Sequence, residues 1–426
     1  MKLLLKSAKI YDQNCPFHLK RKDIFIENGI LKAIDDKIFV ENTTEIISEN
    51  LCVSNGWIDM RVHLREPGFE HIESMQELTD QAIKGGFTSI GLLPNTSPVT
   101  QTKEAIKAIK YFSESQIIDL IPYAAVSKNC EGIDFTDMLD LHYAGAMAFT
   151  DGTKPLYQAD FIAKTLLYLS QIDGLLMNIP NEKSMSAYGL MNESFTSNLL
   201  GMKGLPKITE LMGIERDLNI LEYLAEKGTK VKYHFSLIST LKSVHLIRKA
   251  KAKGLAITCD VAIHNLIFED TILENFDTNY KVNPPFRANE DIEALIEGLK
   301  DGTIDAVVSD HYAHDQENKK LEFDLAEFGI IGLETLFGNL NSLTQKIDLE
   351  TVINLLTQNP AKILKKNIDK IEVNQPANLT FFDPTIVWDY QIDKTRKHIN
   401  NSPFIDKPLV GKVLGIINKN KFNVSN

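Results

Sequence analysis

The stretch WIDMRVHLREPG, residues 57–68, places four polar side chains at alternate positions. Alternate residues of a β-strand point to the same side, so Asp59, Arg61, His63 and Arg65 are predicted to share one face. An aspartate and a histidine at this spacing are typical of the start of a metal site, but an arginine stands where a second ligand would be most useful. Two alternatives follow: a metal-dependent hydrolase, or a related fold that has lost its metal.

Outward from this stretch, strand-like and helix-like segments alternate along the chain. The strand-like runs lie at 51–63, 87–95, 117–126, 145–151, 174–180, 230–239, 255–263 and 304–311. Helix-like segments with apolar residues at i, i+3 and i+4 lie between most of them, as at 74–86, 102–115, 240–254 and 289–302. Eight strands alternating with helices predict an α/β fold, a parallel (β/α)₈ TIM barrel. A doubly wound open sheet is the alternative, but no GxGxxG motif follows an early strand.

The two ends of the chain are rich in short strands and turns. We expect residues 1–52 and 366–426 to form one small composite β-sandwich domain, and residues 53–365 to form the barrel. The sequence "ENG" at 27–29 indicates a β-hairpin within the first of these segments.

Composition narrows the function classes. The 426 residues are 43% hydrophobic and carry a net charge of -11, which argues against binding to nucleic acid or to a membrane surface. No stretch approaches the roughly 18 apolar residues of a membrane span. The 4 cysteines are dispersed without a CxxC pair, as expected of reduced thiols in a cytoplasmic protein.

A barrel places its functional groups at the carboxyl ends of its strands. Polar residues stand at these predicted positions: His63 and Arg65 after the first strand, Asn95 after the second, Asp151 after the fourth and Asp310 after the eighth. Local sequence alone leaves simpler roles open for three of them. Asp310 also fits a helix cap, and Asp151 and Asn95 also fit turns.

Several motifs in order give the chain a family resemblance. WIDMRVHLREPG, GGFTSIGLLPNTSPV, KVNPPFR, IEGLKDGTIDAVVSDHYAH, FGIIGLET and NPAKIL resemble the dihydroorotases of the amidohydrolase superfamily, in the form found in multifunctional pyrimidine complexes. The resemblance extends from about residue 50 to 365. It implies a barrel that holds one or two zinc ions, which polarise a cyclic amide and activate a water.

The metal ligands that the resemblance implies are only partly present. His63 matches the second histidine of the first-strand pair, Asp151 the bridging group of strand four, and Asp310 the strand-eight aspartate, which also shuttles protons. Three other ligand positions hold residues that do not suit zinc: Arg61, Asn178 and Leu237. We therefore expect no zinc here, or one weakly held ion.

Arg61 suggests a replacement for the metal. Its guanidinium is expected to fork onto Asp151 or Asp310 and neutralise carboxylates that zinc would otherwise hold. The alternative is that Arg61 points to solvent while both carboxylates are hydrated.

The positions that hold substrate in the family are better kept. The resemblance assigns the dihydroorotate carboxylate to Arg65, Asn95 and His314, and Asn283 to the ring pocket. The eighth-strand motif departs at Tyr312 and Ala313, where the family usually has Ala-Pro.

These features lead to two main hypotheses. The first is a catalytically silent dihydroorotase homologue of pyrimidine biosynthesis that keeps a pocket for a dihydroorotate-like ligand. It would act by association, as a homodimer or with aspartate transcarbamoylase or another enzyme of the pathway. The alternative is an active dihydroorotase, with one metal or none, that reversibly hydrolyses dihydroorotate to carbamoyl-aspartate. A hydrolase of another cyclic amide or imide is a weaker third hypothesis, because Arg65 and Asn95 fit a carboxylated ring.

Overall fold

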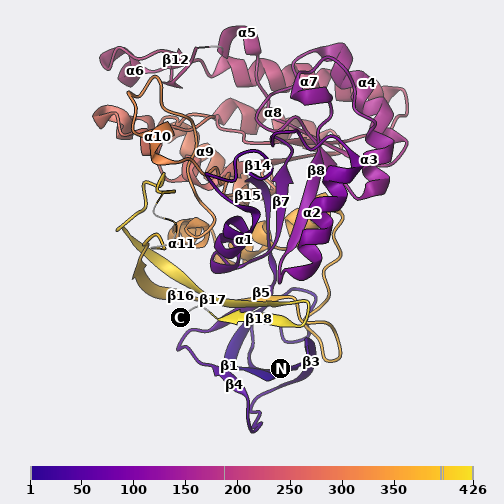
Figure 1. Cartoon of the computed structure of the whole chain (residues 1–426), viewed down its shortest axis with the longest axis vertical. Helices are drawn as coiled ribbons and strands as arrows, with labels where there is room; N and C mark the ends of the chain where they lie inside the picture. The colour runs from indigo at the N-terminus through magenta and orange to yellow at the C-terminus, as the bar shows by residue number, and fades with distance from the viewer. Residues whose placement is uncertain (1, 187, 394–395, 397, 425–426) are drawn as a thin grey trace.

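The structure is a computed structural model that describes residues 2–186, 188–393, 396 and 398–424. A parallel barrel with its surrounding helices forms the larger part, and a separate sheet lies beneath it (Figure 1). The TIM barrel predicted from the alternating segments is confirmed.

The barrel sheet has the strand order β15-β14-β13-β10-β9-β8-β7-β6. Its strands are β6 (Trp57–His63), β7 (Phe87–Leu93), β8 (Asp119–Ala124), β9 (Ala148–Phe149), β10 (Leu175–Asn178), β13 (Lys232–Phe235), β14 (Ile257–Ala262) and β15 (Ala306–Val308). The last and first strands meet through a parallel bridge between Val62 and His311, and the His63 amide donates to the His311 carbonyl over 2.9 Å. This contact closes the barrel.

Helices cover the outside of the barrel (Figure 1). They are α1 (Met75–Lys84), α2 (Lys103–Ser115), α3 (Met138–Ala144), α4 (Ala159–Ser170), α7 (Ile208–Glu226), α8 (Leu241–Ala252), α9 (Asn289–Lys300), α11 (Leu336–Ser342), α12 (Leu349–Leu356) and α13 (Gln358–Leu364). The sequence sets their starts: Ser74 caps α1 in a capping box with Glu77. The chain between β10 and α7 carries the short elements α5 (Lys183–Ser186), β11 (Met191–Asn192), α6 (Phe195–Leu199) and β12 (Gly204–Leu205).

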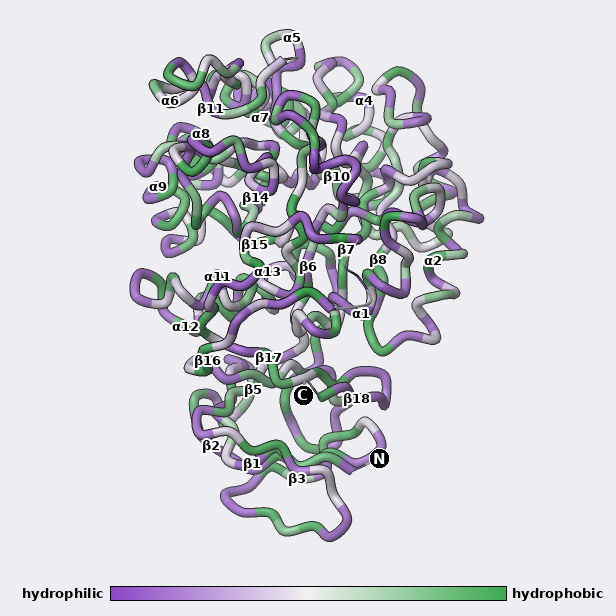
Figure 2. The backbone as a smooth tube through the Cα atoms, turned by 60° about the vertical axis from the view of Figure 1, so that its left-hand side comes forward, coloured by the Kyte–Doolittle hydropathy of each residue, from purple (hydrophilic) through white to green (hydrophobic). Residues whose placement is uncertain are grey.

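The second sheet combines strands from both ends of the chain. Its order is β18-β17-β16-β5-β1-β2-β3, with β4 (Thr44–Ile46) paired to β1. The strands are β1 (Lys2–Tyr11), β2 (Arg21–Glu27), β3 (Ile30–Asp35), β5 (Cys52–Asn55), β16 (Leu379–Asp389), β17 (Pro408–Asn418) and β18 (Lys421–Val424). Figure 2 shows both chain ends in this layer. The predicted hairpin joins β2 to β3, and Asn28 and Gly29 supply the positive φ angles of its two-residue turn.

The prediction of one continuous strand over residues 51–63 is wrong. The segment forms β5 in the terminal sheet and β6 in the barrel, with Gly56 between them. A Cβ atom at Gly56 would stand 2.0 Å from Thr88 Oγ1 and 2.1 Å from Asn378 Oδ1. A residue with a Cβ would therefore have to displace these two side chains where the chain passes from one sheet to the other.

Buried apolar residues form separate cores. The largest lies between the barrel and its helices, a second inside the terminal sheet domain, and a third inside the barrel, where Met60, Met177 and Leu237 meet. Within the described residues, no helix is long and apolar enough to cross a membrane.

Replacing Gly56 by alanine should destabilise the fold because the new methyl group has no space. We expect the free energy of unfolding to fall by about 2 kcal/mol, as in other overpacked sites, and urea denaturation measures it. Gly174→Ala is the matched control, because its Cβ would meet only flexible side chains, the nearest at 3.1 Å. An equal loss in both variants would contradict the steric argument.

Candidate functional site

A cavity of about 260 Å³ opens at the carboxyl ends of the barrel strands. Arg61 and His63 from β6 and Asp310, just after β15, stand at one side of it. Asn283 and Tyr312 also line it, together with the segment 327–329. The barrel thus brings together groups that lie about 250 positions apart in the sequence.

Arg61 points inward and pairs with Asp310. Its Nε donates to Asp310 Oδ1 over 2.8 Å, and the two side chains are only 2% and 10% exposed. His63 Nε2 lies 3.2 Å from the same oxygen. Of the two carboxylates considered for Arg61, Asp310 is therefore the partner, and Asp151 has other contacts.

The contacts of the pair determine its charge state. Burial opposes ionisation of Asp310, but the charge of Arg61 and the hydrogen bond with His63 outweigh it and lower the Asp310 pKa to about 2. Burial lowers the pKa of His63 to about 4, although Asp310 partly opposes this. At neutral pH the site therefore holds a carboxylate, a guanidinium and an uncharged imidazole.

Asp151 is held by the loop that follows β8. Its Oδ1 accepts the backbone amides of Val126 and Ser127 over 2.9 and 3.0 Å, and Oδ2 accepts the Ser127 hydroxyl. Burial nevertheless raises the pKa of Asp151. The nearby Asn95 bonds only to backbone of the same region, donating to the Asp151 carbonyl and accepting the Thr153 amide, each over 3.0 Å. Both residues thus tie loops together.

Asn178 ends β10 in a buried polar network. Its Oδ1 accepts the Leu156 amide over 2.9 Å, and its Nδ2 donates to the Leu156 carbonyl over 3.1 Å. The same nitrogen lies 3.1 Å from the Tyr233 hydroxyl, which in turn donates to Asp217. The Asn178 amide therefore links the loop at Leu156 to β13 and is already engaged in hydrogen bonds.

Leu237 belongs to the apolar core inside the barrel and is 1% exposed. His234, three positions earlier, does not line the cavity. Both ring nitrogens of His234 are engaged outside it, at 2.8 Å from Thr258 Oγ1 and 2.8 Å from Asp260 Oδ2. Within the described part of the chain, no three His, Cys, Asp or Glu side chains gather closely enough to hold a metal ion.

The candidate substrate residues lie at the same end of the barrel. Arg65 is 7% exposed, and its buried Nε has no hydrogen-bond partner. His314 Nε2 lies 2.9 Å from the Phe328 carbonyl, while its buried Nδ1 also has no hydrogen-bond partner. Burial lowers the His314 pKa to about 3, so the ring is neutral. Asn283 lines the cavity, whereas Asn95 is engaged with the loops.

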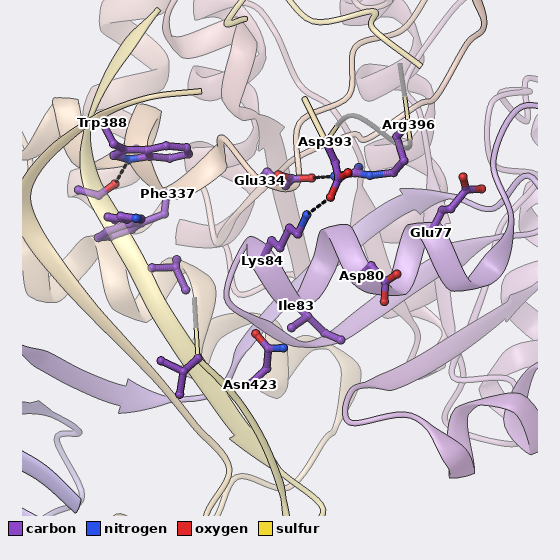
Figure 3. Close-up of a pocket in the computed structure, with 15 residues that line it drawn as sticks. Glu77, Asp80, Ile83, Lys84, Glu334, Phe337, Trp388, Asp393, Arg396 and Asn423 are labelled. Carbon is purple, nitrogen blue, oxygen red and sulfur yellow. Dashed lines mark hydrogen bonds and ion pairs between the residues drawn. The ribbon is translucent and has the colours of Figure 1, made fainter. Parts of the chain in front are cut away.

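A larger hollow of about 550 Å³ lies away from this site, between α1 and the strands β16 and β17 (Figure 3). Its charged groups contact one another: Lys84 pairs with Asp393 over 2.9 Å, and Arg396 pairs with Glu334. It contains none of the candidate site residues.

Sequence reasoning missed two residues of the site. Tyr312 stacks on His63 with ring centroids 3.8 Å apart and planes at 8°. His264 is buried, its Nε2 has no hydrogen-bond partner, and burial lowers its pKa to about 4 against the opposing charge of Asp310. The departure from Ala-Pro at Tyr312 was the signal for the first. No local pattern marked His264.

Comparison with known proteins assigns the family. The model of dihydro-orotase-like proteins matches residues 51–243, and that of the amidohydrolase family matches residues 199–415. A dihydroorotase of Thermoanaerobacter sp. is 38% identical over 92% of this chain and 90% of the relative. One from Caldanaerobacter subterraneus is 36% identical over 92% and 91%. The chain belongs to the dihydroorotase family.

Solved structures show the same fold for this dihydroorotase-family chain. An L-hydantoinase from Arthrobacter aurescens covers all of it with a TM-score of 0.81 at 20% identity, and 97% of that chain is matched. A dihydropyrimidinase from Brevibacillus agri gives 0.80 at 19% identity, covering 100% of this chain and 95% of the other.

Removing the charge of Arg61 should destabilise the protein because Asp310 would remain buried without its partner. We expect Arg61→Met to lower the free energy of unfolding by about 3 kcal/mol at pH 7. The folded-state pKa of Asp310 lies below its ordinary value, so the pair stabilises fully above about pH 4 and this stabilisation is lost as pH falls through 2. Urea titrations at pH 7 and pH 3 test both points, and the deficit should shrink at pH 3.

Arg248→Met is the control for this variant, because Arg248 and Asp301 form an exposed pair, 38% and 41% exposed. Its cost should stay below about 1 kcal/mol. Equal losses in the two variants, or a deficit at Arg61 that does not change with pH, would contradict the buried pair.

Proposed function

We propose that this dihydroorotase-family chain does not catalyse metal-dependent hydrolysis and instead binds a dihydroorotate-like carboxylate. The observation that carries the proposal is the buried pair between Arg61 and Asp310. A fixed cation occupies the side of the site where the family would have its first histidine ligand. The pair satisfies the carboxylate without a metal.

The residues at the other ligand positions do not fit zinc either. Zinc prefers histidine nitrogen, thiolate or carboxylate ligands in a tetrahedral arrangement. Asn178 directs its amide to Leu156 and Tyr233, and Leu237 offers no donor atom. The Asp151 carboxylate already accepts three hydrogen bonds from the loop after β8, and these would compete with an ion. Zinc therefore has no part in the proposed function.

Asp310 and His63 are poorly suited to acid–base catalysis at neutral pH. A general base works best when its pKa lies near the operating pH. The pKa values of Asp310, about 2, and His63, about 4, lie well below 7. Neither group can hold a proton at neutral pH and then donate it, and both are weak bases. This supports a silent site.

The binding half of the proposal rests on Arg65. A buried guanidinium is costly unless it is paired. No ion pair joins Arg65 to a carboxylate within the described residues, and its Nε is left without an acceptor. A ligand carboxylate would supply the missing charge and the missing acceptor. Asn283 and Tyr312 line the adjacent cavity, whose size suits a small ring.

An active dihydroorotase is the second candidate, and the names of the relatives favour it. In that case His63, Asp151 and Asp310 would hold one ion, or the reaction would proceed without one. The first version requires Arg61 to release Asp310 and Asp151 to loosen its hydrogen bonds with the loop after β8. The second requires another source of the hydroxide that a metal-bound water provides at neutral pH.

Metal content and turnover, measured on the same preparation, separate the two candidates. We expect the purified chain to carry far less than one zinc per molecule and to show no turnover of dihydroorotate. Arg61→His, Asn178→His and Leu237→His combined restore the missing ligand types, and this variant should retain zinc after dialysis. Near-stoichiometric zinc with turnover in the unaltered chain would contradict the proposal.

A silent member of this family would act by association. We propose self-association into a homodimer and assembly with aspartate transcarbamoylase or another enzyme of pyrimidine synthesis, in the cytoplasm. The buried, unpaired state of all four cysteines supports a reducing compartment.

Sedimentation velocity of the chain alone and mixed with aspartate transcarbamoylase of the same organism tests this association. We expect a dimer for the chain alone and a faster joint boundary for the mixture. Serum albumin in place of the enzyme is the control. Independent sedimentation of chain and enzyme would contradict assembly with this partner.

A further inference from the structure

Arg65 lies against two aromatic rings. Its guanidinium carbon lies 4.5 Å from the centroid of Phe69 and 5.1 Å from that of Tyr312. Both distances are within the range of cation–π attraction, which strengthens when the cation is removed from water. We call Phe69 and Tyr312 the aromatic clamp of Arg65.

Tyr312 also contacts the other side chains of the site. It stacks almost flat on His63, and its ring centroid lies 4.4 Å from that of His314. Tyr312 thus contacts two candidates for ligand binding, Arg65 and His314. It also contacts His63, which lies beside Asp310. It lines the cavity itself.

The backbone fixes the position of this ring. The Tyr312 amide donates to the Ile330 carbonyl over 2.9 Å, and Asn401 Nδ2 donates to the Tyr312 carbonyl over 2.8 Å. Gly329 leaves room for the side chain, since a Cβ there would stand 2.9 Å from Tyr312 Cβ. Gly329 has a φ of 141°, which glycine adopts without strain. The ring is therefore placed by its surroundings before any ligand arrives.

We propose that Tyr312 is a positioning residue, which holds the guanidinium of Arg65 ready for the carboxylate of a dihydroorotate-like ring. This rests on the proposed binding function and deepens it. A free arginine side chain has many rotamers, and a ligand must fix one of them at an entropic cost. The aromatic clamp fixes one rotamer of Arg65 when the protein folds, so the ligand does not have to fix it. It also gives the buried cation favourable contacts while no carboxylate is present.

Tyr312 acts in recognition of the carboxylate and not of the ligand ring in general. The faces of the Tyr312 ring are covered by His63 and approached by Arg65. A ligand ring would therefore meet the edge of Tyr312. Loss of the tyrosine should therefore weaken binding of a carboxylated ring much more than binding of the same ring without the carboxylate. A purely structural role would weaken both alike.

Calorimetric titration with dihydroorotate and with dihydrouracil, which lacks the carboxylate, tests this selectivity. Tyr312→Ala should lower the affinity for dihydroorotate about tenfold, as expected for loss of one partly desolvated cation–π contact. It should leave the affinity for dihydrouracil within about twofold. Tyr312→Phe keeps the ring and should restore the affinity for dihydroorotate. Tyr143→Ala, at a tyrosine that is 79% exposed, is the control and should change neither affinity.

The outcomes separate this inference from the proposed function. If the unaltered chain does not prefer dihydroorotate over dihydrouracil, the carboxylate pocket itself is wrong and the inference falls with it. If the chain prefers dihydroorotate and Tyr312→Ala keeps that preference, only the inference is wrong.

A measurement without ligand checks the clamp directly. In ¹⁵N-labelled protein, the Arg65 Nε–H signal, assigned by its absence in Arg65→Lys, should exchange slowly with water. Tyr312→Ala should speed this exchange at least tenfold, because a released guanidinium samples water more often, while Tyr312→Phe should not. Equal exchange rates in all three proteins would overturn the proposal.

Discussion

The seam between β6 and β15 is the constraint on which the site depends. A parallel barrel must close between its first and last strands, and here the backbone contributes only a short contact around Val62 and His311. Side chains extend it: Asp59 Oδ2 accepts the Ser309 amide over 3.1 Å, and Arg61 and His63 both reach Asp310. The carboxylate at the mouth of the barrel is therefore also part of its closure.

This double role explains why charge at the seam must be balanced. A carboxylate buried between two strands is costly unless a cation or several donors face it. A metal ion meets that requirement in many proteins, and a guanidinium meets it with its own fixed geometry. Once Arg61 fills this role, the barrel no longer needs an ion for its closure. Asp151, just after β9, has no such cation in contact among the described residues, and its carboxylate instead accepts hydrogen bonds from two backbone amides and a hydroxyl.

The sequence predicted the elements that depend on periodicity and turn residues. It predicted fewer of the features that depend on contacts between distant segments. The eight barrel strands and the hairpin at Asn28 follow from local patterns. The division of residues 51–63 between two sheets does not, because it depends on the approach of Thr88 and Asn378 to Gly56. Arg61 was expected to meet Asp151 or Asp310, and only the folded loops decide between them. The partners of Asp151 and the stack on His63 likewise come from separate segments.

Under the proposed function, the barrel allows a binding pocket to persist without catalysis. Its ligand-facing groups come from separate βα loops, each supported by its own strand, so one group can change without moving the others. Asn178 and Leu237 lie on β10 and just after β13, whereas Arg65 and Tyr312 follow β6 and β15. Asn178 serves hydrogen bonding there, and Leu237 serves apolar packing. The pocket around Arg65 draws on β6 and β15, the two strands of the seam itself, and the buried cation there needs an anion whether or not an ion is bound nearby.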